Sequence, residues 1–259
     1  ILASPRSGST LVREFLATSP DVCALPECAF ALILIDSAEE ANESIRDCIR
    51  VTSLVESLVK VPKWDSWRLH IESVKAELCE KVPISYRDFV LSVYELYRDR
   101  HGYGAVILDK NNSFVDFGDK FCEVFNGSSI LHLVRDPRDV IASQITISRQ
   151  AIDMPHYPRF SDDLDRLAKN WVRQNRWIAR KLDAGDIKGT QIRFEDFLRW
   201  PKSSYETVLI SMGARRWPGL DETFVPAFPP EEIRFHAWRK STFAPIDTKK
   251  IRIHESLLL

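Results

Sequence analysis

The chain has 259 residues, of which 44% are hydrophobic and 28% are charged, and its formal net charge is -1. This length and apolar content are enough to bury a full core, while the near-neutral charge excludes the broad positive surface of a nucleic-acid-binding protein. No apolar run reaches the roughly 18 to 20 residues of a membrane span, so we expect neither a nucleic-acid partner nor a membrane span in this chain.

Short apolar runs predict the strands, and three- and four-residue apolar spacing predicts the helices. The end of a buried strand is expected at residues 1–4, and further strands at residues 105–110 ("AVILDK"), 128–136 ("SSILHLVRD") and 190–196 ("TQIRFED"). The expected helices cover residues 10–18, 37–59, 67–80, 85–99, 137–149 and 162–184.

Strands separated by helices favour an α/β fold, with a mostly parallel central sheet and helices on both faces. No Pro/Gly/Ser-rich linker divides the chain, so we expect a single domain over residues 1–259. Ligands of such sheets bind at the carboxyl ends of the strands. Two polar motifs follow expected strands at such ends.

The first motif is the turn "PRSGST", residues 5–10, between a strand and a helix. The first N–H groups of a helix are unpaired and the helix dipole is positive there, while a glycine such as Gly8 lets an anion approach the backbone. Arg6 adds a fork of charged donors, and hydroxyl donors come from Ser7, Ser9 and Thr10. An ordinary polar turn that caps a helix would carry similar residues. The nucleotide-triphosphatase loop G-x-x-x-x-G-K-[ST] is absent, which disfavours a kinase.

The second motif is "LHLVRDPRDVIAS", residues 131–143. Arg135 ends the expected strand, and Ser143 lies about two helical turns further on. A guanidinium and a hydroxyl placed in this way could converge on one phosphate, which arginine can bind through two parallel hydrogen bonds. Alternatively, Arg135 could pair with Asp136 or Asp139, and Ser143 could be an exposed helix residue.

Together the two motifs are similar to those of the sulfotransferases that use 3′-phosphoadenosine 5′-phosphosulfate (PAPS). "PRSGSTL" resembles the loop of that family that binds the 5′-phosphosulfate, and "LHLVRDPRDVIAS" resembles its 3′-phosphate motif. The resemblance implies a P-loop-like nucleotide fold and transfer of a sulfonate from PAPS to a hydroxyl acceptor, without a metal, leaving adenosine 3′,5′-bisphosphate (PAP). It implies that residues 6–10 hold the phosphosulfate and that Arg135 and Ser143 hold the 3′-phosphate. A non-catalytic nucleotide-binding module and a P-loop kinase are the alternatives.

The same resemblance suggests catalytic residues. In the protein tyrosine and carbohydrate branches the base is a glutamate shortly after the first helix, and Glu27 in "VCALPECAF" has a spacing from Arg6 similar to that of the tyrosine branch. Many cytosolic members use a histidine after a strand-end lysine, whereas Lys110 is followed by two asparagines, which supports Glu27. Lys110 resembles the lysine that steadies the transferring sulfonate, a task shared with Arg6. Glu27 could instead cap a helix or pair with a surface cation, Lys110 could be an exposed strand-end residue, and His156 is a second candidate base.

Other cofactor contacts follow from looser matches to the family. "RFEDFL", residues 193–198, looks like the family's R-Y-E-D-L segment with Phe194 in the tyrosine position, so we expect this ring to pack near the adenine. "AWRKST" contains Arg239 and Lys240, in the region where relatives fold a basic loop over the cofactor.

The acceptor is left open between a hydroxylated small molecule, a glycan and a peptide. Residues 29–104 carry no signature of the family, and we expect an acceptor-side helical insert at about residues 37–99. The loop at residues 152–160 is a second segment expected to face the acceptor.

The five cysteines are an odd number without paired C-x-x-C spacing, which favours buried free thiols over a zinc site or a disulfide framework. The sequence begins inside an apolar run without a methionine, which suggests either an excised domain or missing disordered residues. By default we expect a cytoplasmic protein, with the catalytic domain of a lumenal enzyme as the alternative.

Overall fold

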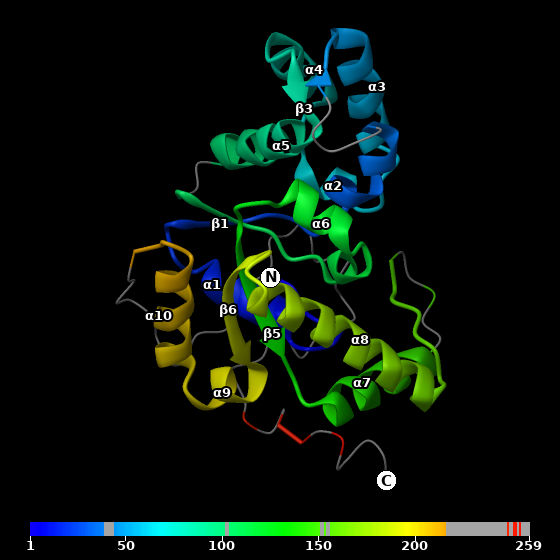
Figure 1. Ribbon diagram of the computed structural model, residues 1–259, viewed down its shortest axis with the longest axis vertical. Helices are drawn as coiled ribbons and strands as arrows, with labels where there is room; N and C mark the ends of the chain where they lie inside the picture. The colour runs from blue at the N-terminus through cyan, green and yellow to red at the C-terminus, as the bar shows by residue number, and fades with distance from the viewer. Residues whose placement is uncertain are drawn as a thin grey trace.

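The computed structural model describes residues 1–38, 44–101, 104–150, 153, 156–215, 248, 251, 252 and 254 (Figure 1). The strands in this part of the chain are β1 (Val22–Ala24), β2 (Ser44–Ile45), β3 (Ile84–Ser85), β4 (Val106–Leu108), β5 (Ser129–Val134) and β6 (Lys188–Arg193). The α-helices are α1 (Ser9–Leu16), α2 (Phe30–Ile33), α3 (Cys48–Leu58), α4 (Ile71–Glu80), α5 (Tyr86–His101), α6 (Asp119–Val124), α7 (Pro137–Gln150), α8 (Leu164–Asp183), α9 (Phe194–Arg199) and α10 (Pro201–Ser211). Short 3-10 helices are η1 (Ile35–Ala38), η2 (Trp64–Trp67) and η3 (Asn112–Asp116).

The central sheet is parallel. β1 pairs with β4 and β5 pairs with β6, both in parallel register. Residues 1–4 run between these pairs, because the Leu2 N–H donates to the Leu131 carbonyl at 2.9 Å and the Ile1 backbone nitrogen donates to the Asp109 carbonyl just beyond β4. The order across the sheet is therefore β1, β4, residues 1–4, β5 and β6. The predicted α/β fold with a mostly parallel sheet is confirmed.

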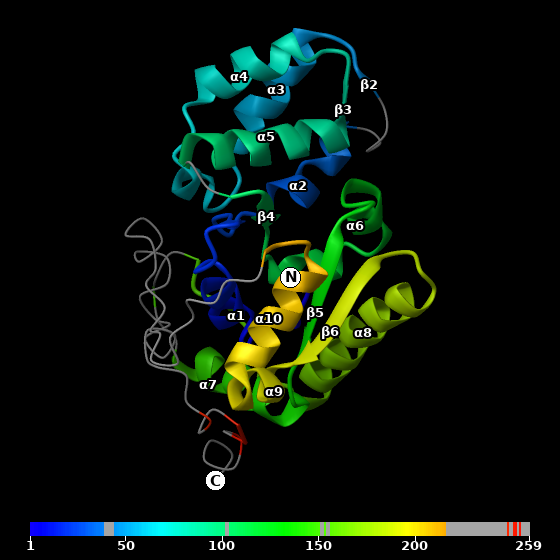
Figure 2. The same ribbon diagram turned by 90° about the vertical axis from the view of Figure 1, so that its left-hand side faces the viewer.

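Side chains of β5 alternate between two layers of helices. Figure 2 shows α1 and α10 on one side of β5 and β6 and α8 on the other. Leu131 and Leu133 join the core formed with α1, α9 and α10. His132 points the opposite way, where its Nε2 lies 3.0 Å from Asn175 Oδ1 of α8. This histidine is 1% exposed and is therefore part of the core between the sheet and α8.

A helical unit of α3, α4 and α5 lies beyond the β1–β4 edge of the sheet (Figure 1). Phe30 of α2 packs edge-on against Trp64 and Trp67 of η2, with ring centroids 5.6 and 5.3 Å apart, and also contacts Tyr94 of α5. These aromatic rings belong to the same core as Leu2 of the sheet. The unit is therefore anchored to the sheet by continuous apolar packing.

The helix predicted over residues 37–59 is wrong in its first half. η1 ends at Ala38, β2 pairs with β3, and α3 begins only after Asp47, whose carboxylate accepts a hydrogen bond from the Arg50 N–H at 2.8 Å. Asp47 is a helix-capping residue, and its side chain satisfies a backbone N–H that the helix leaves unpaired.

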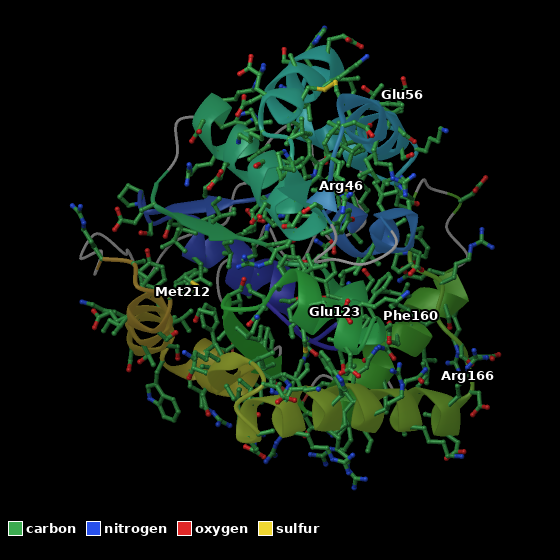
Figure 3. All side chains as sticks on the ribbon, turned by 45° about the horizontal axis from the view of Figure 1, so that its top comes forward. Arg46, Glu56, Glu123, Phe160, Arg166 and Met212 are labelled. Carbon is green, nitrogen blue, oxygen red and sulfur yellow. A yellow bond between two sulfur atoms is a disulfide. The ribbon has the colours of Figure 1, made fainter. Side chains whose placement is uncertain are left out.

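A disulfide joins Cys48 of α3 to Cys79 of α4, with the Cα atoms 4.9 Å apart (Figure 3). The expectation that all the cysteines are free thiols is therefore wrong for this pair. Cys23, Cys28 and Cys122 are free. No spacing pattern marks this pair, because the two bonded cysteines meet only through the packing of α3 against α4.

The described part of the chain contains no helix that combines the length and the apolar character needed to cross a membrane. The same residues contain no group of three or more histidine, cysteine, aspartate or glutamate side chains that could hold a metal ion.

Candidate active site

The turn between residues 1–4 and α1 is tightly folded. Arg6 and Gly8 both have positive φ angles, 76° and 89°. The Phe194 ring at the start of α9 presses on the turn, and a Cβ atom on Gly8 would lie 2.2 Å from it. Glycine is therefore required at this position by backbone conformation and by space.

Replacing Gly8 by alanine should lower the free energy of unfolding by more than the roughly 1 to 2 kcal/mol that left-handed strain alone costs. Gly127→Ala is the matched control, because Gly127 has a φ of 79° and no atom within 4 Å of an added Cβ. Denaturant unfolding of both variants measures the difference. Equal losses would show that the Phe194 ring moves aside without cost.

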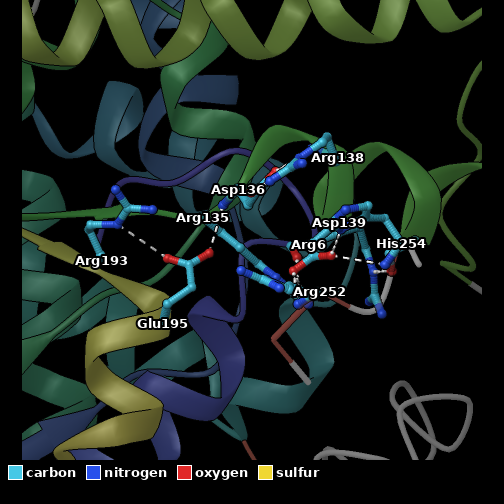
Figure 4. A network of polar contacts seen from close by, with 10 residues as sticks. Arg6, Arg135, Asp136, Arg138, Asp139, Arg193, Glu195, Arg252 and His254 are labelled. Carbon is cyan, nitrogen blue, oxygen red and sulfur yellow. Dashed lines mark hydrogen bonds and ion pairs between the residues drawn. The ribbon is translucent and has the colours of Figure 1, made fainter. Parts of the chain in front are cut away.

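The two polar motifs meet at the carboxyl end of the sheet. Arg6 Nε donates to Ser143 Oγ at 3.1 Å, and Arg135 Nη1 donates to the Arg6 carbonyl at 3.2 Å. The Arg135 guanidinium also lies over the Phe194 ring, 4.9 Å from its centroid. Ser143 is half-buried, so it is not simply an exposed helix residue. Residues predicted from separate stretches of sequence thus lie together (Figure 4).

Arg135 also makes the ion pair weighed as an alternative role. Its Nη2 lies 3.6 Å from Asp139 Oδ2, and both side chains are buried. Burial lowers the pKa of Arg135, while the Asp139 carboxylate opposes this shift. Asp139 in turn accepts hydrogen bonds from the Arg252 N–H at 3.0 Å and the His254 N–H at 2.9 Å (Figure 4). Asp139 therefore holds the Arg135 guanidinium and also binds the backbone of Arg252 and His254.

Hydroxyl groups of the turn differ in their surroundings. Ser9 Oγ donates to Asn112 Oδ1 at 2.9 Å, and Thr10 is half-buried beside it. Ser7 is 1% exposed, and its Oγ has no hydrogen-bond partner among the residues that the structure describes. Gly8 supplies no side-chain cap to α1. An unpartnered buried hydroxyl, an uncapped helix start and two arginines fit the oxygens of an anionic ligand.

Glu27 lies between two lysines. Its Oε1 accepts from Lys110 Nζ at 2.7 Å and its Oε2 accepts from Lys63 Nζ at 2.8 Å. Lys110 is 1% exposed and Lys63 is 18% exposed, so neither ion pair is a fully solvated surface contact. The α2 helix has Ala29 at its N-cap position, so Glu27 is not the cap. Sequence reasoning missed Lys63, which lies in the segment without a recognised signature.

Polar groups on both sides of Lys110 in the sequence hold the turn that follows β4. Asn111 Nδ2 donates to Asp109 Oδ1 at 2.6 Å, and the Tyr94 hydroxyl donates to the other oxygen of that carboxylate. Burial raises the pKa of Asp109 to about 6. Burial also raises the pKa of Cys28 to about 12, so this thiol stays protonated near neutral pH and is a poor nucleophile.

A cavity of about 350 Å³ connects the two polar motifs with Glu27. His156 lines it and is exposed, and its pKa is lowered by partial burial and by the charge of Lys63. Arg239 and Lys240, predicted to cover the cofactor, lie outside the described residues. The cavity walls include Arg6, Gly8, Ser9, Thr10, Glu27, Lys63, Asn112, Arg135, Pro158, Phe160 and Phe194.

Comparisons with known proteins agree with this geometry. A model of the sulfotransferase family matches residues 1–218. The solved sulfotransferase domain from the curacin biosynthetic pathway aligns over 96% of this chain and 83% of its own, with a TM-score of 0.56 and 19% identity. The sulfotransferase domain from the Synechococcus PCC 7002 olefin synthase aligns over 100% of this chain and 93% of its own, with a TM-score of 0.57 and 20% identity. These structures show a shared fold, and no curated protein gives a match.

Proposed function

Because the chain belongs to the sulfotransferase family and shares its P-loop-like fold, its chemistry is sulfonate transfer, and we propose that the donor is PAPS and the acceptor a hydroxyl group. The observation that carries this proposal is the meeting of Arg6, Arg135 and Ser143 beside a cavity that also contains Glu27. Two arginines that converge beside one cavity suit a ligand that carries more than one anionic group, as PAPS does.

The proposed mechanism uses three groups of the chain. Glu27 accepts the proton of the acceptor hydroxyl, whose oxygen forms a bond to sulfur while the bond from sulfur to the phosphate oxygen breaks. Arg6, Lys110 and the N–H groups at the start of α1 hold the sulfonate oxygens and the leaving phosphate, where negative charge develops. Arg135 and Ser143 hold the 3′-phosphate, and Phe194 packs near the adenine.

Mass spectrometry provides the direct test. Purified protein incubated with PAPS and a panel of hydroxylated small molecules, glycans and peptides should add one sulfonate to an acceptor and release an equal amount of PAP. PAP binding without transfer to any acceptor class would favour a non-catalytic nucleotide-binding module.

Transfer should not depend on magnesium. Arg6, Lys110 and the first N–H groups of α1 supply the positive charge that a metal would otherwise bring to the transferring group. Initial rates measured with excess chelator and with added magnesium should agree. A rate abolished by the chelator and restored by magnesium would favour the P-loop kinase instead.

The compartment and the domain organisation are part of the same proposal. We retain a single domain whose helical unit forms the acceptor side, because Lys63 of that unit reaches the cavity. Disulfides persist mainly in oxidising compartments, so the Cys48–Cys79 bond favours the lumenal alternative over the cytoplasm.

A further inference from the structure

Lys63 reaches the active site from the helical unit, and its backbone is held in an unusual conformation. Its φ angle is 70°, a left-handed value that is uncommon for residues other than glycine. Ser66 fixes the turn, because its N–H and its hydroxyl donate to the Lys63 carbonyl at 3.1 and 2.7 Å. The rings of Trp64 and Trp67 stack on each other and pack against the core. A rigid aromatic base therefore directs this ammonium group toward Glu27.

The charges around Glu27 leave a specific task for Lys63. In the proposed function, Lys110 holds the transferring sulfonate, yet in the structure Lys110 Nζ lies 2.7 Å from Glu27 Oε1. When Lys110 turns toward the sulfonate, Oε1 is released and can accept a hydrogen bond from the acceptor hydroxyl. Lys63 lines the cavity and stays on Oε2, so the carboxylate keeps one cationic partner.

We propose that Lys63 is a positioning residue that keeps Glu27 ionised and directed at the acceptor hydroxyl while Lys110 engages the sulfonate. This inference rests on the proposed function. The hydroxyl proton moves to Glu27 Oε1, the acceptor oxygen bonds to sulfur, and the electrons of the broken sulfur–oxygen bond leave with PAP.

Several charged groups surround Glu27, and Lys63 belongs to the segment between α3 and η2, where Asp65 lies two positions further on and acts through its charge on His156 and Cys28. Lys110 and Asp109 follow β4, and the Asp109 carboxylate interacts with Glu27 through its charge. Arg6 faces the same cavity from the turn before α1, and His156 faces it from the loop after α7. The neighbouring thiol of Cys28 is neutral. Replacing Lys63 by a neutral residue therefore removes a positive charge beside the Glu27 carboxylate and favours the protonated form of Glu27.

The test compares pH–rate profiles of Lys63→Met, Lys63→Arg and a control, Lys60→Met. Methionine keeps an unbranched chain at the strained backbone position, and Lys60 is an exposed lysine of the same segment. We expect Lys63→Met to move the acid limb of the kcat profile to a pH about 1 unit higher than in the wild type. At pH values below this limb its kcat should be lower than that of the wild type, and its PAP affinity should stay within twofold of the wild-type value. Lys63→Arg should restore the limb, and Lys60→Met should match the wild type.

An unchanged acid limb in Lys63→Met would overturn the proposal, as would a loss of activity that arginine does not restore. Thermal unfolding of Lys63→Met and Lys63→Arg separates a folding defect from a positioning role. If the wild type transfers no sulfonate, the proposed function fails, but titration of carboxyl-labelled Glu27 by NMR, assigned with Glu27→Gln, still tests Lys63. The Glu27 midpoint should rise in Lys63→Met, and an unchanged midpoint would overturn the proposal by itself.

Discussion

Glu27→Gln is expected to lower turnover by roughly 100-fold or more, the usual range for a positioned general base. Glutamine keeps the volume of the side chain but removes the charge that accepts the proton and holds Lys110 and Lys63. PAP affinity should stay near that of the wild type, because the Asp139 carboxylate and the Phe194 ring that hold Arg135 are unchanged in this variant. Steady-state rates and PAP calorimetry measure the two quantities.

Glu123→Gln is the matched control, because Glu123 is exposed on α6 (Figure 3) and does not line the active-site cavity. It should retain full turnover. Near wild-type turnover of Glu27→Gln would dismiss Glu27 as the base, and His156 would be the next residue to replace. Equal losses of turnover and PAP affinity would indicate a collapsed cavity instead.

Arg135→Ala is expected to erase most of the preference for PAP over adenosine monophosphate. A charge-assisted hydrogen bond contributes roughly 1.5 to 3 kcal/mol, which is about 10- to 150-fold in affinity. The guanidinium is held for this task by the Asp139 carboxylate and the Phe194 ring. Calorimetry with both nucleotides should show a large loss for PAP and a small one for the monophosphate.

Two further variants separate recognition from stability. Arg138→Ala removes a neighbouring guanidinium that is 64% exposed and paired with Asp136, so PAP affinity should change little. Arg135→Lys keeps a positive charge near Asp139 but loses the two-pronged geometry, and its PAP affinity should be intermediate. If the wild type bound both nucleotides equally, Arg135 and Ser143 would lose their assigned role at the 3′-phosphate.

Strands and helices that a short stretch of sequence marks by its own residues were predicted correctly. β5 consists mostly of branched apolar residues, and α7 begins at Pro137, which suits the first turn of a helix. β1 and β4 each have three residues, too few for a readable alternation, and β4 was predicted only because it lies in a run of branched apolar residues that β1 lacks. β6 ends earlier than expected because Phe194 starts a helix. β2 and β3 stabilise each other only as a pair, so neither has a local signal.

The parts of the candidate site that belong to a sequence motif were predicted. The parts that depend only on packing were missed. The turn around Gly8 and the strand-end position of Arg135 follow from short sequence patterns. The hydrogen bond from Arg6 to Ser143 joins residues 137 positions apart, and no single stretch of sequence encodes it. Lys63 depends on the aromatic packing of the helical unit, so its contact with Glu27 appears only in three dimensions.

The disulfide between Cys48 and Cys79 has a topological consequence for catalysis. Its two ends are 31 positions apart, and Lys63 lies between them, so the residue that reaches Glu27 sits within a closed covalent ring. Thiol exchange with the surroundings decides whether this ring is closed. Reduction leaves the contact between α3 and α4 to non-covalent packing, while the turn around Gly8 lies outside the ring and keeps all its covalent bonds. Two preparations of one sequence, with and without a reductant, thus differ covalently in the helical unit that we propose to face the acceptor and are identical at the turn that we propose to hold the donor.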